Sequence, residues 1–427
     1  MPTETIPPSE ADLKEWRREF HRYPEPGWCE FRTTVRIVEE LEQLNVDEIH
    51  IGADALDPDE RLGVPEEDVL SEWYEKATSE TNRTDVLEQI QGGRTGVVAI
   101  VENGEGPTVG LRVDIDALPI TESTDGDHRP ASDGFRSTNE EVMHACGHDS
   151  HITFGLGTIQ SVIQRDFSGT LKVFFQPAEE LLGGGKAMAS GPHIDDVDYL
   201  FGAHVGLDYP TGTVVAGLDE ALALARMDVT FEGESAHAGL APNEGRNAVQ
   251  ALIAAAHNIY AIPRHREGKT RVNIGEISAD NAANIIADRA TASIEVRGES
   301  TELMEYMRDA VQRHVNTAAE MHECDAEISL TGESIRQDCD GELVDLVSET
   351  VTDRSESLSL IRRDALAASE DATYLMKAVT ENGGKATYIG IGGNNPSGHH
   401  TPKFDIDEEC LSIGVEVLSK SVLKRLS

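Results

Sequence analysis

The sequence predicts an α/β protein with a mostly parallel central sheet, into which a smaller α+β domain is inserted. Short apolar runs separated by turn residues alternate with longer amphipathic stretches, as in β-α-β units whose sheet is buried on both faces. Residues 222–332 instead follow the order β-α-β-β-α-β, which is typical of a ferredoxin-like sandwich. A chain of 427 residues, 39% of them apolar, is large enough for two domains with sizeable cores.

The first part of the chain, residues 1–221, begins with two predicted helices. An amphipathic pattern over 9–46 is interrupted at 23–27, where two prolines and a glycine force a turn. Residues 52–94 are acidic and polar, with a short helical stretch near 69–74, and we interpret them as a surface insertion. The elements of the sheet follow, with strands expected at 95–101, 108–113 and 171–175 and a helix at 151–164.

The inserted domain is expected at 222–332, and the chain returns to the first domain over 333–427. Within the insertion, the pattern predicts strands and helices in alternation: strands at 225–232, 271–277, 290–297 and 325–331, and helices at 245–260 and 301–318. After it, helices at 341–352 and 406–424 flank a further strand at 386–391. The expected organisation is therefore one split domain that carries another.

The composition is strongly acidic, which limits the partners of the protein. Lys and Arg number 36 against 78 Asp and Glu, a net charge of −42 that is spread along the chain, so nucleic acid and anionic membrane surfaces would be repelled. No apolar run reaches the roughly 18 residues of a membrane span. The N-terminus does not resemble a secretory signal, and the five cysteines form no CxxC pair. We expect a cytoplasmic protein with reduced thiols from a high-salt organism, where salt screens the acidic surface.

Two segments carry side chains of the types that bind transition metals. Cys146 and His148 stand two residues apart at a loop that feeds a helix, so a thiolate and an imidazole can converge on one cation. The strand at 171–175 ends in a proline and delivers the carboxylates of Glu179 and Glu180 to its C-terminal end, where ligands of open α/β sheets gather. Adjacent side chains leave an extended chain on opposite sides, so one glutamate can bind metal while the other faces a water.

Two later segments add imidazoles. His204 follows an apolar run at 199–201, and His399 and His400 stand in a loop before Pro402. Each segment alone also fits an ordinary loop, capping or core residue. Together the four segments offer one thiolate, one carboxylate and three imidazoles, a set that fits two metal ions sharing a bridge, at distances of about 2.0–2.3 Å if the ions are zinc.

Six motifs occur along the chain: RRxFHxYPExGWxEFRT (17–33), LRVDIDALPI (111–120), MHACGHDSH (143–151), FFQPAEE (174–180), GAHVG (202–206) and HHTPKFDIDE (399–408). In this order they resemble the M20 metallopeptidase family, and more narrowly its amidohydrolase branch. That branch includes hydrolases of N-acyl-amino acids, indoleacetyl-amino acids and aminobenzoyl-glutamate. The resemblance implies a zinc-peptidase-like catalytic domain and an inserted lid domain that mediates dimerisation.

The resemblance also implies a dinuclear centre of Mn²⁺ or Zn²⁺, with Co²⁺ as an alternative, in which Cys146 bridges. The implied ligands are Cys146, His148, Glu180, His204 and His400. His400 is preferred over His399 because it stands two residues before Pro402, as the family's ligand does. The wider family has a His-x-Asp motif where this chain has Asp114-Ile115-Asp116, so His148 replaces the missing ligand and Asp116 is expected to orient an imidazole.

Four further residues receive roles by the same resemblance. Glu179 would act as the general base, and His237 would polarise the scissile carbonyl. Asn284 would line the pocket, and Arg297 would bind a substrate carboxylate in bidentate fashion. Each of the last three also fits an ordinary surface or capping residue. Asn243 stands where many relatives have a second histidine, so any role of that histidine is lost.

The expected function is metal-dependent hydrolysis of the amide between an acyl or aroyl group and an amino acid, with aminobenzoyl-glutamate as one candidate. A general N-acyl-amino-acid hydrolase is an alternative of the same class. A non-catalytic partner subunit is an alternative of another class, but it would be expected to have lost a ligand or Glu179. The expected partners are a small-molecule substrate and a second copy of the chain, or a second hydrolase subunit, but neither nucleic acid nor a membrane.

Overall fold

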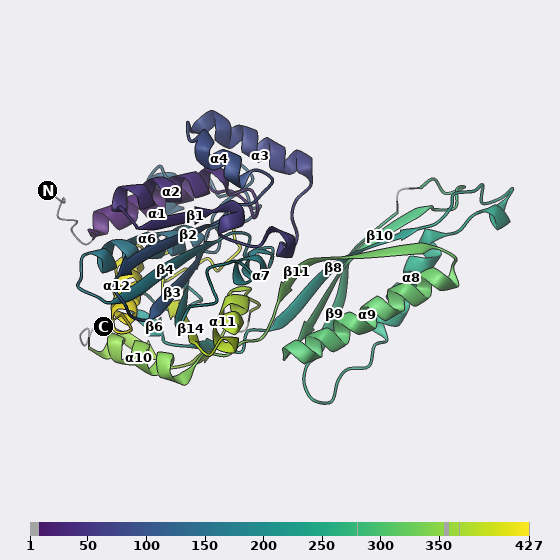
Figure 1. Cartoon of the computed structure of the whole chain (residues 1–427). Coiled ribbons are helices and arrows are strands. Elements are labelled where there is room, and N and C mark those ends of the chain that lie inside the picture. The colour runs from purple at the N-terminus through teal and green to yellow at the C-terminus, as the bar shows by residue number, and fades with distance from the viewer. Residues whose placement is uncertain (1–7, 280, 354–357, 367, 427) are drawn as a thin grey trace. The chain divides into compact units, whose positions relative to one another are not determined.

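The computed structural model describes residues 8–279, 281–353, 358–366 and 368–426 (Figure 1). The expectation about a secretory signal falls partly on residues 1–7, which lie outside the described residues. The chain forms two compact units: unit 1 is Met1–Asp219, Gln337–Leu366 and Asp371–Ser427, and unit 2 is Glu220–Arg336 and Ala367–Glu370. No described helix combines the length and the apolar composition that a membrane crossing needs.

Unit 1 is built on a mixed sheet of eight strands. In spatial order they are β1 (Glu48–Ile51), β2 (Val97–Asn103), β4 (Gly169–Gln176), β3 (Thr108–Asp114), β5 (Tyr199–Val205), β14 (Lys385–Ile391), β6 (Thr213–Val215) and β12 (Ser359–Ile361). The pairs β3–β4, β3–β5, β5–β14 and β6–β12 are parallel, and the others are antiparallel. The predicted α/β fold is confirmed. The strand expected at 95–101 is β2, and it runs antiparallel to both of its neighbours in the sheet, β1 and β4. The connection from β2 to β3 is too short to hold a crossover helix, so β2 and β3 run in opposite directions.

Helices pack around this sheet. They are α1 (Glu10–Arg22), α2 (Phe31–Leu44), α3 (Glu67–Glu80), α4 (Thr84–Ile90), α5 (Arg129–Ser132), α6 (His148–Ile163), α7 (Gly184–Ala189), α10 (Gly341–Thr352), α11 (Ala372–Glu381) and α12 (Glu409–Leu423). α6 packs on α1, α12 and β3, while α11 packs on α7 and β14. The small elements are single 3-10 turns at 52–54 and 58–60 and a two-stranded parallel sheet of β7 (Leu218–Asp219) and β13 (Asp364–Ala365).

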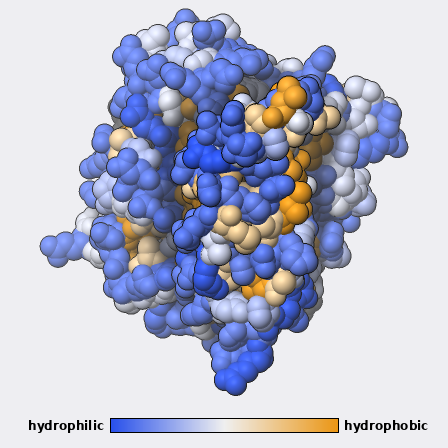
Figure 2. Space-filling model, turned by 90° about the vertical axis from the view of Figure 1, so that its right-hand side faces the viewer, coloured by the Kyte–Doolittle hydropathy of each residue, from blue (hydrophilic) through white to orange (hydrophobic). Residues whose placement is uncertain are grey.

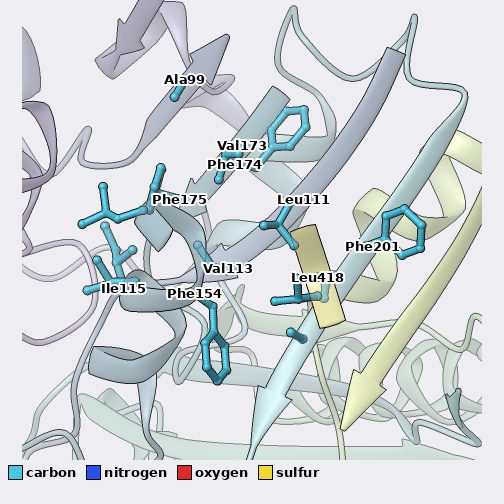
Figure 3. Close-up of a cluster of buried hydrophobic side chains, with 14 of the residues drawn as sticks. Ala99, Leu111, Val113, Ile115, Phe154, Val173, Phe174, Phe175, Phe201 and Leu418 are labelled. Atoms are coloured by element: carbon cyan, nitrogen blue, oxygen red, sulfur yellow. The ribbon is translucent and has the colours of Figure 1, made fainter. Parts of the chain in front are cut away.

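One part of the core of unit 1 lies between the sheet and the helices α6 and α12. Figure 3 shows Leu111 and Val113 of β3 near Phe154 of α6 and Leu418 of α12, and all four side chains are fully buried. The two helices approach closely because α12 carries a glycine: a Cβ at Gly414 would lie 2.4 Å from the ring of Phe154. This packing holds the first turn of α6, where His148 stands, against the sheet.

Unit 2 is an antiparallel sheet with two helices on one face. Its elements are β8 (Ala223–Glu232), a 3-10 turn at 242–244, α8 (Ala248–Tyr260), β9 (Thr270–Ser278), β10 (Arg289–Gly298), α9 (Thr301–Met321) and β11 (Asp325–Ser334). The strand order β11-β8-β10-β9 and the β-α-β-β-α-β sequence confirm the ferredoxin-like prediction. Alternate side chains of β8 and β10 enter a hydrophobic core with α8 and α9 that is separate from that of unit 1.

A buried polar network attaches α1 to the start of α6. Arg17 Nε lies 2.8 Å from Asp149 Oδ2, and His21 Nδ1 lies 2.8 Å from the same oxygen. His21 Nε2 reaches Glu122 Oε1 at 3.0 Å, and Arg17 Nη2 donates to Asp405 Oδ1 at 2.9 Å. Buried charges are stable only when they are paired in this way, so the N-terminal motif secures the residue next to His148.

Glu122→Gln should reduce the acid sensitivity of the fold. Burial alone would raise the pKa of Glu122, but hydrogen bonds from His128, His21 and the amide of Ser137 lower it from 4.5 to about 2. The carboxylate therefore contributes about 3 kcal/mol that is present above pH 4.5 and is lost as the pH falls through about 2. Urea unfolding between these pH values should show a shallower pH dependence in the variant. The exposed Glu72→Gln in α3 is the control, and equal slopes in both variants would exclude this role for Glu122.

Candidate metal centre

The structure brings the five predicted ligands together in unit 1. They come from the loop before α6 and the first residue of α6, the turn after β4, the last residues of β5 and the loop after β14. The ligand atoms of Cys146, His148 and His204 lie within 4.8 Å of one another, and so do those of Cys146, Glu180 and His400. Cys146 belongs to both groups.

The spacing of the donor atoms is compatible with coordination of a shared metal ion. Cys146 Sγ lies 3.5 Å from His204 Nε2, and Glu180 Oε2 lies 3.5 Å from His400 Nε2. Two ligand atoms bound to the same tetrahedral zinc stand roughly 3.3–3.8 Å apart, since each lies about 2.0–2.3 Å from the metal.

Two of the imidazoles are oriented by their other nitrogen. His148 Nδ1 donates to Asp116 Oδ1 at 3.1 Å, as expected for Asp116, and His148 Nε2 is buried with no hydrogen-bond partner among the described residues. His204 Nδ1 donates to the carbonyl oxygen of Val205 at 2.9 Å, so its Nε2 faces Cys146. Metal-binding histidines are held in this way, with the outer nitrogen donating and the inner one presenting its lone pair. The residues present therefore fit a metal.

The local backbone explains how these side chains converge. Gly147 has φ +95°, and a Cβ there would lie 2.4 Å from Val205 Cγ1, so only glycine fits between Cys146 and the first residue of α6. His400 also lies in the left-handed region, with φ +57°, and its amide donates to the carbonyl of Ala145 at 2.8 Å. That hydrogen bond fixes the loop of His400 beside the loop of Cys146.

The electrostatics of the pocket favour positive charge. Burial opposes protonation of His148, but the charges of Asp114 and Glu180 and the hydrogen bond with Asp116 raise its pKa to about 10. Burial raises the pKa of Glu180 to about 8, and repulsion from Asp116 and Asp114 adds to this effect. Burial and the neighbouring His151 lower the pKa of His204, which keeps that imidazole neutral and able to bind a cation. A divalent cation would supply the positive charge that these carboxylates demand.

Two neighbouring histidines have structural partners on both nitrogens. His151 donates from Nδ1 to Asp114 and accepts from the amide of Val205 at Nε2, at 2.8 Å, although it lies within ligand reach of His148. His399 accepts from Asn395 at Nδ1 (3.0 Å), so its Nε2 faces the carbonyl of Val205 (3.3 Å) as a donor. These partners favour His400 over His399 as a ligand.

Glu179 lies next to the ligand groups without belonging to either of the two that share Cys146. It is 6% exposed, and its Oε2 lies 3.8 Å from His148 Nε2. Glu179 and Glu180 lie in the turn after β4, so the alternation of side chains along an extended strand does not apply to them. Glu179 Oε2 and Glu180 Oε1 lie 3.8 and 3.7 Å from the same nitrogen, His148 Nε2.

The other three predicted site residues belong to unit 2. His237 is exposed and accepts at Nδ1 from the amides of residues 239 and 240, at 3.1 Å each, so Nε2 carries its proton. Asn284 lies on the segment that pairs with that of His237. Arg297 of β10 is partly exposed, and its Nε donates to Glu295 Oε1 at 2.7 Å.

A set of buried polar residues around Arg112, behind the predicted ligands, was not predicted from the sequence. Arg112, inside the apolar strand β3, donates to Asp114 at 2.8 Å, to Gln176 at 2.8 Å and to Asp371 at 3.2 Å. It thereby holds Asp114 beside the histidines of α6. A charged residue in the middle of an apolar strand was the available signal, but its partner Asp371, 259 residues away, could not be found from local spacing.

The chain is similar in sequence to known proteins. Residues 110–424 match the model of Peptidase family M20/M25/M40. The chain is 38% identical to one of the subunits of the p-aminobenzoyl-glutamate hydrolase of Escherichia coli K12 and 38% identical to the indole-3-acetyl-aspartic acid hydrolase of Enterobacter agglomerans. In both cases the match covers 96% of this chain and 95% of the relative.

The chain is also similar in fold to solved structures. The aminobenzoyl-glutamate utilization protein of Klebsiella pneumoniae superposes with a TM-score of 0.82 at 33% identity, covering 97% of this chain and 95% of that chain. A dinuclear metal binding peptidase of Bacillus subtilis shares the fold, with a TM-score of 0.66 at 23% identity and 98% coverage of both chains.

His400→Ala should weaken divalent-cation binding at least about tenfold, because the variant loses an imidazole that faces Glu180. His399→Ala should weaken it less, since that imidazole is engaged with Asn395 and Val205. Calorimetric titration of the chelator-treated variants with Zn²⁺ and with Mn²⁺ measures both. The opposite order of affinities would assign the ligand to His399.

Proposed function

Because this chain belongs to peptidase family M20/M25/M40 and is a metal-dependent amidohydrolase of that family, we propose that it cleaves the amide between an aroyl or acyl group and an acidic amino acid. p-Aminobenzoyl-glutamate is the first candidate substrate. The convergence of the five ligand residues beside Glu179 carries this proposal. Two relatives at 38% identity are named for an aromatic acyl group joined to glutamate or to aspartate, which supports this substrate class.

We propose that the centre holds two divalent cations. Cys146 would belong to both, with His148 and His204 in one group and Glu180 and His400 in the other. Thiolate and imidazole donors suit Zn²⁺, whereas the carboxylates around them also suit Mn²⁺, and Co²⁺ accepts the same set. Such ions supply Lewis-acid polarisation of an amide carbonyl and lower the pKa of a water.

Glu179 is proposed to move the proton. Its carboxylate is buried beside the ligands, where it can accept a proton from the attacking water and then deliver it to the nitrogen of the departing amine. The carboxylate itself is only 6% exposed, which shields the proton it holds from bulk water between the two steps.

Unit 2 is proposed to supply the substrate contacts. With Nδ1 occupied by two backbone amides, His237 presents an Nε2–H donor that suits the oxygen of a polarised carbonyl. Arg297, oriented by Glu295, suits the carboxylate of the amino-acid part, and Asn284 would line the same pocket. These assignments extend the family resemblance to residues whose local geometry is compatible with it.

We further propose a homodimer formed through unit 2. Its edge strand β9 and the neighbouring α8 expose Ile277, Ile253 and Tyr260 to solvent. Figure 2 shows that apolar residues gather in stripes on an otherwise hydrophilic face of the molecule. Exposed apolar side chains beside an unpaired strand edge favour association. A heteromer is the alternative, because the Escherichia coli relative is named as one subunit of its hydrolase.

The proposed substrate class is tested by a hydrolysis panel. The protein, loaded with Mn²⁺ or Zn²⁺, should hydrolyse p-aminobenzoyl-glutamate and other N-aroyl derivatives of acidic amino acids faster than N-acyl derivatives of neutral ones. Arg297→Met should reduce this preference by raising KM for the acidic substrates. Equal rates on neutral and acidic substrates would favour a general N-acyl-amino-acid hydrolase, and no turnover of any member would favour a non-catalytic partner subunit.

Glu179→Gln should remove most turnover while metal binding remains. The amide of glutamine cannot accept the proton of the water, and general acid–base catalysis is worth about 10²–10⁴-fold. The measurements are kcat on the best substrate and the metal content after dialysis. A variant that keeps near-wild-type kcat would exclude Glu179 as the base, and one that loses its metal would make Glu179 a ligand.

A further inference from the structure

The carboxylate of Glu30 is fully buried and is not used by its own helix. Glu30 directly precedes the first residue of α2, and its side chain makes no capping hydrogen bond to that helix. Its Oε2 instead accepts from the hydroxyl of Thr95 at 2.5 Å, and its Oε1 accepts from the amide of Ala178 at 2.8 Å. Three segments far apart in the chain therefore meet at one carboxylate.

Ala178, which donates its amide to Glu30, has an unusual backbone conformation. Ala178 is fully buried with φ +53°, in the left-handed region that side chains other than glycine rarely adopt. It directly precedes Glu179 and Glu180, and its carbonyl accepts from the amide of Gly183 at 3.0 Å. Such a conformation persists only where the surroundings hold it.

Two glycines near Glu30 and Thr95 in the sequence, Gly27 and Gly96, pack closely against this turn. A Cβ at Gly27 would lie 3.1 Å from Ala178 Cα, and a Cβ at Gly96 would lie 2.8 Å from Pro177 Cδ. Both glycines let the chain approach the turn more closely than a side chain would permit. The same segments that supply the hydrogen-bond partners thus also confine the backbone of residues 177–178.

We propose that Glu30 is a positioning residue: by binding the amide of Ala178 it holds the left-handed turn that aims Glu179 and Glu180 into the metal pocket. The inference rests on the proposed function of those two glutamates. It assigns a purpose to Glu30, one of the glutamates of the motif at 17–33, which the proposed chemistry does not otherwise use. Asp116 holds the other side of the turn, since the amide of Glu180 donates to its Oδ2 at 3.0 Å.

The test compares Glu30→Met, which is of similar size but removes both acceptors, with Glu30→Gln, which keeps a carbonyl for Ala178. Glu25→Met is the matched control. Glu25 is a buried glutamate of the same motif, and it accepts from the amides of Arg32 and Thr33 at 3.0 and 2.7 Å, away from the turn. Loss of either glutamate should lower the melting temperature, but only loss of Glu30 should disturb the pocket.

The first measurement is hydrogen–deuterium exchange of the metal-free protein over residues 176–183. Glu30→Met should speed exchange there at least about tenfold, Glu30→Gln should restore most of the protection, and Glu25→Met should leave it unchanged. The second measurement is the visible spectrum of the Co²⁺-loaded protein together with kcat and KM. Glu30→Met should shift the spectrum and lower kcat about 10–100-fold with little change in KM.

Wild-type exchange and spectrum in Glu30→Met, or equal changes in Glu25→Met, would overturn the proposal. If Glu30→Met does not fold, Thr95→Val removes one of the two hydrogen bonds and should speed the same exchange, while Thr95→Ser should not. If the wild-type protein neither binds Co²⁺ nor hydrolyses the substrate panel, the proposed function fails. The exchange measurement on metal-free protein still decides whether Glu30 holds the turn.

Discussion

Several buried carboxylates stand beside imidazoles and a thiol at the carboxyl end of the strands of unit 1, and their combined negative charge is the constraint on which the rest of the site depends. Asp114 and Asp116 are fully buried, and Glu179 and Glu180 are nearly so. Buried charges of one sign are costly unless opposite charge compensates them. Arg112 compensates part of this charge through its ion pair with Asp114. The remaining carboxylates belong to or adjoin groups of side chains that could hold a metal ion.

The elements that carry these side chains are held in place by close packing and by buried ion pairs. α6 is held to the sheet by the close approach of Phe154 to Gly414, and its first turn is tied to α1 through Asp149. Two of the imidazoles that face the pocket are oriented by a hydrogen bond at their other nitrogen, His148 by Asp116 and His204 by the carbonyl of Val205. A site arranged in this way loses little entropy when a cation binds, because its ligands are already in place.

Much of this arrangement could be predicted from the sequence, because motif order and strand ends indicate where side chains emerge. Periodicity placed the two helices of the N-terminal segment and all six elements of unit 2. The candidate ligands followed from residue types at strand ends. The direction of β2 was not predictable from its apolar run, and neither were long-range partners such as Asp371 for Arg112. The preference for His400 over His399 came from the family resemblance, and the partners of His399 add a physical reason.

The most direct test of the central claim is an anomalous-scattering crystal structure of the protein loaded with Zn²⁺ or Mn²⁺. We expect two peaks in unit 1 on either side of the sulfur of Cys146, one near His148 and His204 and the other near Glu180 and His400. Peaks at other residues, or a pocket that stays empty at saturating metal while the protein is folded, would contradict it.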